Sequence, residues 1–396
     1  MANKTIGILT GGGDVPGLNA VIKSVVYSAL GKGGYDVVGI RRGWAGLVNP
    51  KLEDGFDDDY CIRLDRDNTR SIDRTGGTFL HTSRTKPSRM KADQLPEHVQ
   101  KNLGACEEVE PGVFDMAPVV IENLQRLGVD HLLTIGGDDT LSYSSVLSTE
   151  HGFPVVAVPK TMDNDVQGTE YCIGFSTALT RAVDAVNRLR TTLGSHERIG
   201  VFRIFGRDAG FTALYTAYIT SVRCCIPEVA FNLGNLIELL VKDKEDNPSN
   251  YSLVILSEGA TWEGREVKEY GPPDDYGHRK KVNIAEAFSD QIKNQTRHTS
   301  QQDTVVYDLT YQLRSGDPDF LDKMIASTFA TMAFECIDSG GAGRMMAIQN
   351  GCYTETAIPD PGLGARTVDL DTMYNTDRFR PNYSNKQGLP IFLTRV

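Results

Sequence analysis

Residues 5–17 read TIGILTGGGDVPG, an apolar run followed by three glycines, an aspartate and a proline. The run at 5–10 predicts a buried strand, and the residues from Pro16 to Leu30 predict a helix with the proline in its first turn. Glycines let a backbone approach an anion closely, and a helix start offers free N–H groups. The stretch therefore predicts an anion-binding loop between a strand and a helix, with a tight structural turn as the alternative.

The same alternation of apolar runs and helical patterns recurs along the chain and predicts an α/β fold with parallel sheets. Further strands are expected at 131–135, 154–158, 199–204, 251–256, 303–309 and 345–348, and helices at 176–193, 209–222, 281–294 and 319–338. The polar residues 242–250 are typical of a loop. The residues after Pro359, rich in proline, asparagine, aspartate and arginine, are typical of a tail packed on the surface.

The length of 396 residues indicates at least two domains, because a single core seldom grows past about 250–300 residues. A net charge of −11 argues against sequence-independent nucleic-acid binding, which needs many Lys and Arg side chains. The seven cysteines have neither a C-x-x-C motif nor metal-ligand spacing, which favours reduced thiols in the cytoplasm. Because no secretory signal pattern and no apolar run of about 18 residues is present, we expect no leader and no membrane span.

Two more loops carry chemically active side chains. Residues 136–140 read GGDDT after the strand at 131–135, and residues 159–165 read PKTMDND after the strand at 154–158. In open α/β sheets, ligands bind at the carboxyl ends of the strands. Carboxylates there suit Mg²⁺, and a lysine, a hydroxyl and a base suit phosphoryl transfer. The structural alternatives are a helix start with acids in its first turn and a surface turn rich in Asp and Asn.

Four shorter segments complete a recognisable order: GGTFL at 76–80 leading to Arg84, FGR at 205–207, SEG at 257–259 and YQLR at 311–314. From Ile6 to about Asn350 the chain resembles the phosphofructokinase family. The resemblance implies two Rossmann-like parallel-sheet domains. Residues 1–173 with about 312–360 would bind the phosphoryl donor, residues 174–311 the sugar phosphate, and residues 361–396 would form a C-terminal extension.

Two substitutions concern the donor. ATP-dependent members of the family typically carry Gly-Gly-Asp-Gly-Ser and Pro-Gly-Thr, where this chain has Asp139 and Lys160. It therefore resembles the diphosphate-dependent branch. A carboxylate at Asp139 would oppose the α-phosphate of ATP by charge and volume, and Lys160 would offer a cation to diphosphate. Because some ATP-using relatives keep the lysine but have glycine in the other loop, Asp139 is the more decisive residue.

The resemblance also implies a role for individual residues. Asp163 would be the general base, with Lys160 and Asp139 as further catalytic residues, Asp138 as the Mg²⁺ ligand and Asp165 in support. The expected diphosphate-binding residues are Gly13, Arg84 and Lys160. The expected substrate-binding residues are Thr161, Met162, Asp163, Phe205, Gly206, Arg207, Glu258, Tyr311, Arg314 and, from a neighbouring subunit, Arg198. Val305 stands where relatives have a second 6-phosphate-binding arginine.

The implied function is a reversible, Mg²⁺-dependent transfer from diphosphate to the 1-hydroxyl of fructose 6-phosphate in glycolysis or gluconeogenesis, by a homodimer or homotetramer with no nucleic-acid or membrane partner. Alternatives are ATP as donor, or a broader acceptor range that includes sedoheptulose 7-phosphate. An NAD or lipid kinase is disfavoured by residues 163–165 and 311–314, and a non-catalytic subunit by the intact Asp138, Lys160 and Asp163. A nicotinamide oxidoreductase would need a G-x-G-x-x-G fingerprint.

Overall fold

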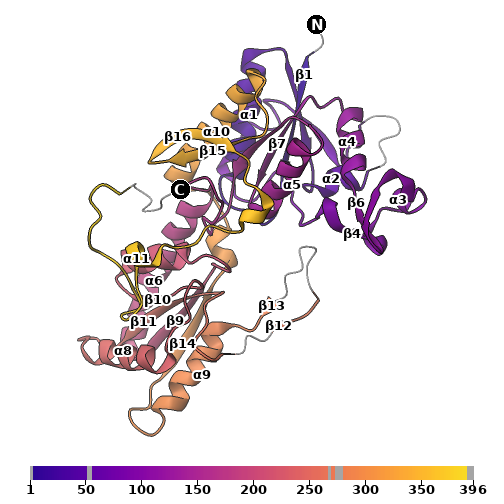
Figure 1. Ribbon diagram of the computed structural model, residues 1–396. Coiled ribbons are helices and arrows are strands. Elements are labelled where there is room, and N and C mark those ends of the chain that lie inside the picture. The colour runs from indigo at the N-terminus through magenta and orange to yellow at the C-terminus, as the bar shows by residue number, and fades with distance from the viewer. Residues whose placement is uncertain (1–2, 51–55, 266–268, 273–279, 390–396) are drawn as a thin grey trace.

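The computed structural model, which describes residues 3–50, 56–265, 269–272 and 280–389, has two lobes, each built around an open sheet (Figure 1). Residues 390–396 of the expected C-terminal extension lie outside the described residues. The larger lobe holds both the start of the chain and strands from its last quarter. In the described part of the chain, no helix is long and apolar enough to cross a bilayer.

The larger sheet has seven strands in the order β16-β15-β8-β7-β1-β2-β3. The central strands are parallel, and β3 and β16 join its edges antiparallel. Both faces of this sheet are buried under apolar side chains, which agrees with the near-continuous Val, Ile and Leu runs of its strands. The strand bounds are β1 Lys4–Thr10, β2 Tyr35–Ile40, β3 Cys61–Leu64, β7 His131–Gly136, β8 Val155–Pro159, β15 Arg344–Gln349 and β16 Cys352–Ala357.

Helices cover both faces of this sheet. One core cluster packs α1 and α10 against it, and a second packs α4 and α5 against the opposite face. The bounds are α1 Leu18–Lys32, α2 Ala45–Val48, α4 Ala117–Arg126, α5 Asp138–Thr149 and α10 Phe320–Asp338. The expected strands at 5–10, 131–135, 154–158 and 345–348 and the expected helix at 319–338 are confirmed within one or two residues.

The smaller sheet has four parallel strands in the order β10-β11-β9-β14. Helices α6 and α7 cover one face, and α8 and α9 the other. The strands and helices predicted here are confirmed within three residues, whereas β10 and α8 were not predicted. The bounds are β9 Ile199–Ile204, β10 Arg223–Cys225, β11 Ser252–Ser257, β14 Thr304–Leu309, α6 Phe175–Ser195, α7 Phe211–Thr220, α8 Leu233–Glu245 and α9 Ile284–Thr296. One apolar cluster runs through both lobes, so their shared face is a continuous core.

Short elements decorate the lobes. A three-stranded sheet with α3 projects from the larger lobe, and a hairpin of β12 and β13 projects from the smaller one (Figure 1). Their bounds are β4 Met90–Lys91, β5 Glu107–Glu110, β6 Val113–Asp115, α3 Glu97–Gln100, β12 Glu269–Tyr270 and β13 Lys280–Lys281. Single 3₁₀ turns lie at Ile72–Arg74, Pro87–Arg89, Ala92–Gln94, Leu103–Ala105, Tyr311–Arg314 and Pro361–Leu363.

Helix α1 begins at Leu18, two residues later than predicted, and Pro16 lies in the preceding turn. Gly17 has a φ of 110°, a left-handed conformation that a helix interior does not allow. A Cβ atom at Gly17 would also lie 2.5 Å from Cγ2 of Ile173. The glycine therefore sets the helix start, rather than the proline.

The prediction of a loop at 242–250 was wrong for its first four residues. Helix α8 continues to Glu245 because Leu236, Ile237 and Leu240 form a buried stripe on one face. The helix starts after Asn232, whose side chain accepts a hydrogen bond of 3.0 Å from the N–H of Asn235. Of the polar residues 242–245, Asp243 and Lys244 are partly buried and bond to Arg223 and Gln302.

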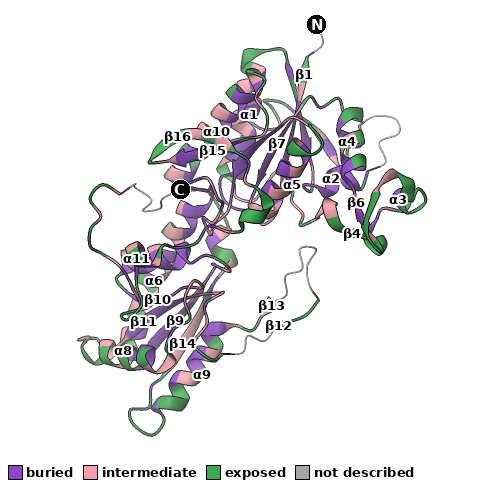
Figure 2. Ribbon diagram, in the orientation of Figure 1, coloured by how far each residue is buried: buried purple, intermediate pink, exposed green. Residues whose placement is uncertain are grey.

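The residues after Pro359 are more than a surface tail. They form α11 (Leu370–Met373), β17 (Tyr374–Asn375) and β18 (Arg380–Pro381), and several of their side chains are buried (Figure 2). Phe379 joins the core of the smaller lobe, and its backbone oxygen accepts a bond of 2.8 Å from the N–H of Cys224. The described part of the C-terminal extension is therefore an integral layer of the smaller lobe.

Candidate active site

Three predicted loops meet at the carboxyl edge of the larger sheet. Thr10 of β1 pairs with Ile135 of β7, and Gly136 of β7 pairs with Pro159 of β8, so the three strands end side by side. The N–H of Gly11 donates to the oxygen of Ile135 over 3.0 Å, and the N–H of Lys160 donates to the oxygen of Gly136 over 2.9 Å. The sheet register thus brings together loops that are distant in the sequence: the bonded residues Gly13 and Lys160 are 147 positions apart.

The glycines of the first two loops permit close packing. A Cβ atom at Gly11 would lie 2.4 Å from Oγ1 of Thr140, and one at Gly136 would lie 2.3 Å from Cβ of the same threonine. The N–H groups of Gly11 and Gly12 are bonded to the oxygens of Ile135 and Ser83. Of the three glycines, Gly13 is therefore the one whose N–H we expect to serve an anion.

The segment that leads to Arg84 lies over the first loop. Oγ1 of Thr82 donates to the oxygen of Gly12 over 2.6 Å, and the N–H of Gly12 donates to the oxygen of Ser83 over 3.1 Å. Arg84, which is exposed, directly follows Ser83, the residue that these bonds hold against the glycine loop. Its predicted role in diphosphate binding is compatible with this position and stays a prediction.

Lys160 is the cation at the centre of the loops. It is only 3% exposed, and its Nζ donates to the oxygen of Gly13 over 2.7 Å. Burial, and then the charge of Arg314, lower the pKa of Lys160 to about 8, against the opposite effect of Asp14 and Asp165. A lysine held in this way can lose its charge near physiological pH.

Arg314 also reaches the first loop. Its Nη1 lies 2.8 Å from the position a Cβ of Gly13 would take, and its Nε is 3.5 Å from Oδ1 of Asp14. The guanidinium stacks on Tyr311 at 4.8 Å and lies 5.9 Å from the ring centroid of Phe205. The structure thus groups the three predicted sugar-phosphate residues, and it adds a contact with the donor loop that the sequence did not indicate.

Four aspartates, Asp138, Asp139, Asp163 and Asp165, and Glu258 lie close enough to interact with one another. Desolvation, and then the neighbouring Asp165 and Glu258, raise the pKa of Asp163 well above its ordinary value. Among the described residues, its buried Oδ1 has no hydrogen-bond partner. Desolvation raises the pKa of Asp165 to about 6. Desolvation and the charge of Asp139 raise the pKa of Asp138. Such mutual repulsion is expected where a bound cation completes a site.

Asp138 and Asp139 are also the first two residues of α5. The structural alternative for residues 136–140, a helix start with acids in its first turn, is therefore confirmed. It does not replace the functional interpretation, because a helix N-terminus favours carboxylates and also faces the ligand edge of the sheet.

The described residues hold no group of three His, Cys, Asp or Glu side chains placed to bind a metal ion. Mg²⁺ usually takes one or two carboxylates and completes its shell with water and substrate phosphates. The carboxylates around Asp138 fit that mode, in which the substrate supplies part of the coordination shell.

The acceptor side comes from the smaller lobe. Arg207 follows β9 and forms an ion pair of 2.6 Å with Asp208, and Glu258 follows β11 and lies 3.3 Å from Arg203. Gly206 has a φ of 127°, and its oxygen accepts a bond of 3.0 Å from the N–H of Gly259. Residues 205–207 and 257–259 are therefore fixed to each other at the carboxyl edge of the second sheet.

The loop at 159–165 joins the two lobes. Oγ1 of Thr161 accepts a bond of 3.1 Å from the N–H of Asp163, and Oγ1 of Thr212 in α7 donates to the oxygen of Met162 over 2.8 Å. The Met162 side chain is buried in the common core. The loop therefore faces the donor glycines on one side and the sugar-side residues on the other.

Arg198 is the one predicted site residue that the structure places at the far end of its own sheet. It precedes β9, whereas Arg207 follows β9, and a strand of six residues separates its ends by roughly 17 Å. Val305 pairs with Gly200 and lies toward the same far end. Within one chain, Arg198 and Arg207 are therefore too far apart to share a site. This separation is compatible with the prediction that Arg198 acts in a neighbouring subunit.

Three residues of the site were missed in the sequence. Arg203 interrupts an otherwise apolar strand, pairs with Asp308 at 2.9 Å, and could have been noticed as a charge within a buried run. Asp208 directly follows the predicted Arg207 and could have been found by that adjacency. Arg366 of the C-terminal extension donates to the oxygen of Asn164, and no local pattern signals it.

The chain was compared with known proteins. The family model described as Phosphofructokinase matches residues 5–337. A pyrophosphate–fructose 6-phosphate 1-phosphotransferase of Streptomyces coelicolor is 33% identical over 366 residues, which cover 92% of this chain and 96% of that protein. An ATP-dependent 6-phosphofructokinase 3 of the same organism is also 33% identical, over 365 residues with the same coverage. The crystal structure of a pyrophosphate-dependent phosphofructokinase from Nitrosospira multiformis matches 98% of this chain and 95% of its own, with a TM-score of 0.74 and 16% identity.

Proposed function

Since this chain belongs to the phosphofructokinase family and is a phosphotransferase, we propose that its donor is inorganic diphosphate and its acceptor fructose 6-phosphate. The observation that carries the choice of donor is the pair of carboxylates, Asp138 and Asp139, at the start of α5. Relatives named for either donor are equally similar to this chain, so identity alone does not discriminate between them.

The electrostatics of the loop support diphosphate. The charge of Asp139 already raises the pKa of Asp138, after desolvation, so a further anion beside both is unfavourable. ATP must place its α-phosphate and nucleoside beyond the two phosphates that it shares with diphosphate. A carboxylate on that path disfavours ATP by charge and volume, whereas diphosphate ends before it. Lys160 and Arg314, which meet at Gly13, supply the positive charge that diphosphate needs.

The transfer itself follows from the central loop. Asp163 takes the proton of the 1-hydroxyl as that oxygen attacks the terminal phosphorus, and a P–O bond forms there. The bridging P–O bond of diphosphate breaks, and orthophosphate leaves. The products are fructose 1,6-bisphosphate and orthophosphate, and the same groups serve the reverse reaction.

The carboxylates also fit Mg²⁺. They are hard oxygen ligands in a site where desolvation, and then charge repulsion, raise the pKa of Asp138 and of Asp165. Asp138 would hold the ion, with Asp165 in support, and bound Mg²⁺ would neutralise charge on the diphosphate oxygens. We assign donor binding to residues 1–173 with about 312–360, and sugar-phosphate binding to residues 174–311.

The reaction is tested by following ³¹P NMR of the purified chain with Mg²⁺, diphosphate and fructose 6-phosphate. We expect a resonance at the 1-phosphate of the sugar and an equal amount of orthophosphate. Sedoheptulose 7-phosphate in place of fructose 6-phosphate measures the breadth of the acceptor range. Hydrolysis of diphosphate without a sugar product would contradict the proposal.

A further inference from the structure

The C-terminal extension reaches the loop that carries the proposed base. The N–H of Arg366 donates to the oxygen of Asp165 over 2.7 Å, and Nη2 of Arg366 donates to the oxygen of Asn164. Two residues later, the N–H of Val368 donates to Oε1 of Glu228 over 2.9 Å. We call residues 366–368 the strap.

The strap connects two parts of the site. Oε1 of Glu228 also accepts a bond of 2.8 Å from the N–H of Gly210, which directly precedes α7. The strap is therefore bonded on one side to the loop at 163–165, and on the other to the start of the helix that follows the sugar-side residues 205–207. A chain segment some 200 residues away in sequence thus fixes the distance between them.

The backbone at Asn164 needs this support. Asn164 has a φ of 55° and is fully buried between Asp163 and Asp165. Its side chain is held at both ends, by a bond of 2.9 Å to the oxygen of Glu170 and one of 2.8 Å from the N–H of Cys172. Left-handed backbone outside glycine persists only where the surroundings fix it. The carbonyl of Asn164 has Arg366 as its donor, so the strap completes the set of contacts.

The Arg366 side chain is built into the protein rather than laid on it. It is 6% exposed, and its guanidinium lies 4.7 Å from the ring centroid of Phe211. Its Nε and Nη1 are buried, and within the described residues neither has a hydrogen-bond partner. A buried arginine with such incomplete bonding is costly, and it is retained here where one donor reaches the loop between two carboxylates.

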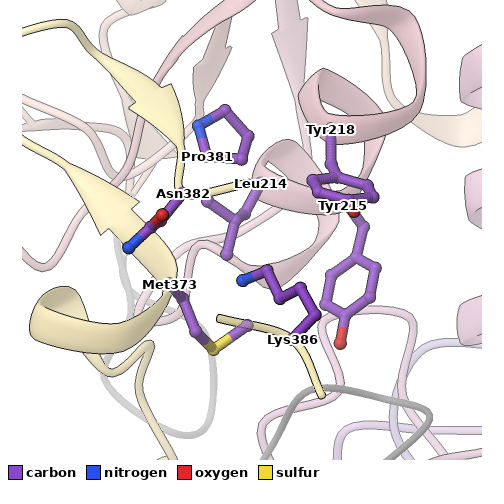
Figure 3. Close-up of a pocket in the computed structure, with 7 residues that line it drawn as sticks. All are labelled: Leu214, Tyr215, Tyr218, Met373, Pro381, Asn382 and Lys386. Atoms are coloured by element: carbon purple, nitrogen blue, oxygen red, sulfur yellow. The ribbon is translucent and has the colours of Figure 1, made fainter. Parts of the chain in front are cut away.

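The extension is anchored independently of Arg366. Leu214, Tyr215 and Tyr218 of α7 face Met373 and Pro381 of the extension across a small apolar pocket (Figure 3). Nη1 of Arg380 donates to the oxygen of Ser221 over 2.9 Å, away from the loop. Arg380 therefore offers a matched control: an arginine of the same extension that makes a backbone bond outside the site.

We propose that Arg366 is a positioning residue for phosphoryl transfer. It fixes the backbone between Asp163 and Asp165, so that the base and its supporting carboxylate hold their places relative to the sugar-side residues. What it positions rests on the proposed function, but the bond to Asn164 stands without it.

The test compares wild type with Arg366→Met, Arg366→Lys and the control Arg380→Met. Hydrogen exchange of the amides at 163–166 is measured without substrate, and kcat and KM are measured with it. We expect exchange to rise at least tenfold in Arg366→Met, on the order of a tenfold to hundredfold loss of kcat, and a KM for fructose 6-phosphate that changes less than about threefold. Arg366→Lys should recover part of both, and Arg380→Met should change neither.

Unchanged exchange at 163–166 in Arg366→Met would overturn the proposal. The proposal would also be overturned if Arg366→Met and Arg380→Met lost kcat equally and in proportion to their loss of thermal stability. If Arg366→Met does not fold, Arg366→Lys carries the same comparison, because it keeps the charge and loses the planar donor. A wild type that shows the exchange pattern but no phosphotransferase activity would contradict the proposed function and leave the positioning intact.

Discussion

At the scale of single residues, the site is defined by desolvated charges. Asp163 has a buried oxygen that no group in the described part of the chain bonds, and desolvation raises its pKa well above the ordinary range of carboxyl groups. A base with a raised pKa is better matched to proton transfer near neutral pH than an ordinary carboxylate. The value of the site for catalysis therefore comes from its surroundings as much as from the residue types.

Replacing Asp163 by Asn should lower kcat by roughly 10²–10⁴-fold, since the base is lost and the shape is kept. The base acts in its deprotonated form, so the activity of wild type should fall as pH drops through the raised pKa of Asp163. The profile of kcat/KM for fructose 6-phosphate should show this acidic limb above about pH 4. Asp184→Asn, at an exposed ion pair on α6, is the control. An Asp163→Asn variant with near wild-type kcat would exclude the base role.

The lowered pKa of Lys160 predicts that the pH profile of kcat/KM for diphosphate falls on the alkaline side. Its charged form attracts diphosphate, and burial lowers its pKa to about 8, so kcat/KM for diphosphate should fall as pH rises through that value in the free enzyme. Lys160→Arg stays charged at this pH and should lose the limb, whereas Lys160→Met should lower kcat/KM at every pH. An unchanged limb in Lys160→Arg would assign it to another group.

At the scale of elements, α6 is capped from another helix. Asp322 of α10 accepts bonds of 2.8 Å from the N–H groups of Gly174 and Thr177, and it also accepts from the hydroxyl of Tyr171 and that of Thr177. This carboxylate replaces the side-chain cap that Gly174 cannot provide. Because Ile173, next to Gly174, exchanges backbone bonds with Pro159 and Thr161, the same contacts also support the loop at 159–165.

Replacing Asp322 by Ala should lower the free energy of unfolding by about 2–4 kcal/mol, because it leaves several buried donors unsatisfied. Asp322→Asn keeps one acceptor oxygen and should lose less. Urea denaturation at pH 7 measures both. Equal midpoints for wild type and Asp322→Ala would show that the cap is not needed.

The sequence predicted the strands and the donor loops more completely than it predicted the helices and the C-terminal extension. The seven predicted strands were found because their apolar runs are continuous, and the three donor loops because parallel strands end at one edge, but β2 and β10 were not predicted. Helix α8 was not predicted, and residues 242–245 were predicted as a loop because they are polar and none of them is buried. Arg366 could not be predicted, because its partner Asn164 lies 202 residues earlier and no periodic pattern links an irregular extension to a loop.

At the scale of the whole molecule, we propose that a second chain completes the site. Arg198 lies across the smaller sheet from Arg207, so we expect it to act in the site of a neighbouring copy. Asp163→Asn and Arg198→Ala should each lose activity alone. After mixing and exchange of subunits, hybrid dimers would hold one site with both residues, and about a quarter of all sites should regain activity.

The readout is the activity of the mixture relative to wild type, with each variant alone as the control. Mass spectrometry verifies that the subunits have exchanged. If activity does not recover after that exchange, Arg198 does not complete a neighbouring site. Full activity of wild type at a dilution where it is monomeric would mean the same.

The central claim is that Asp139 selects diphosphate over ATP, and the most direct measurement is kcat/KM for both donors in wild type and Asp139→Gly. Wild type should use diphosphate and show little activity with ATP, and Asp139→Gly should lose several orders of magnitude with diphosphate. Gain of ATP activity is expected to be small unless Lys160 is changed as well. A wild type that uses ATP readily and diphosphate poorly would contradict the account.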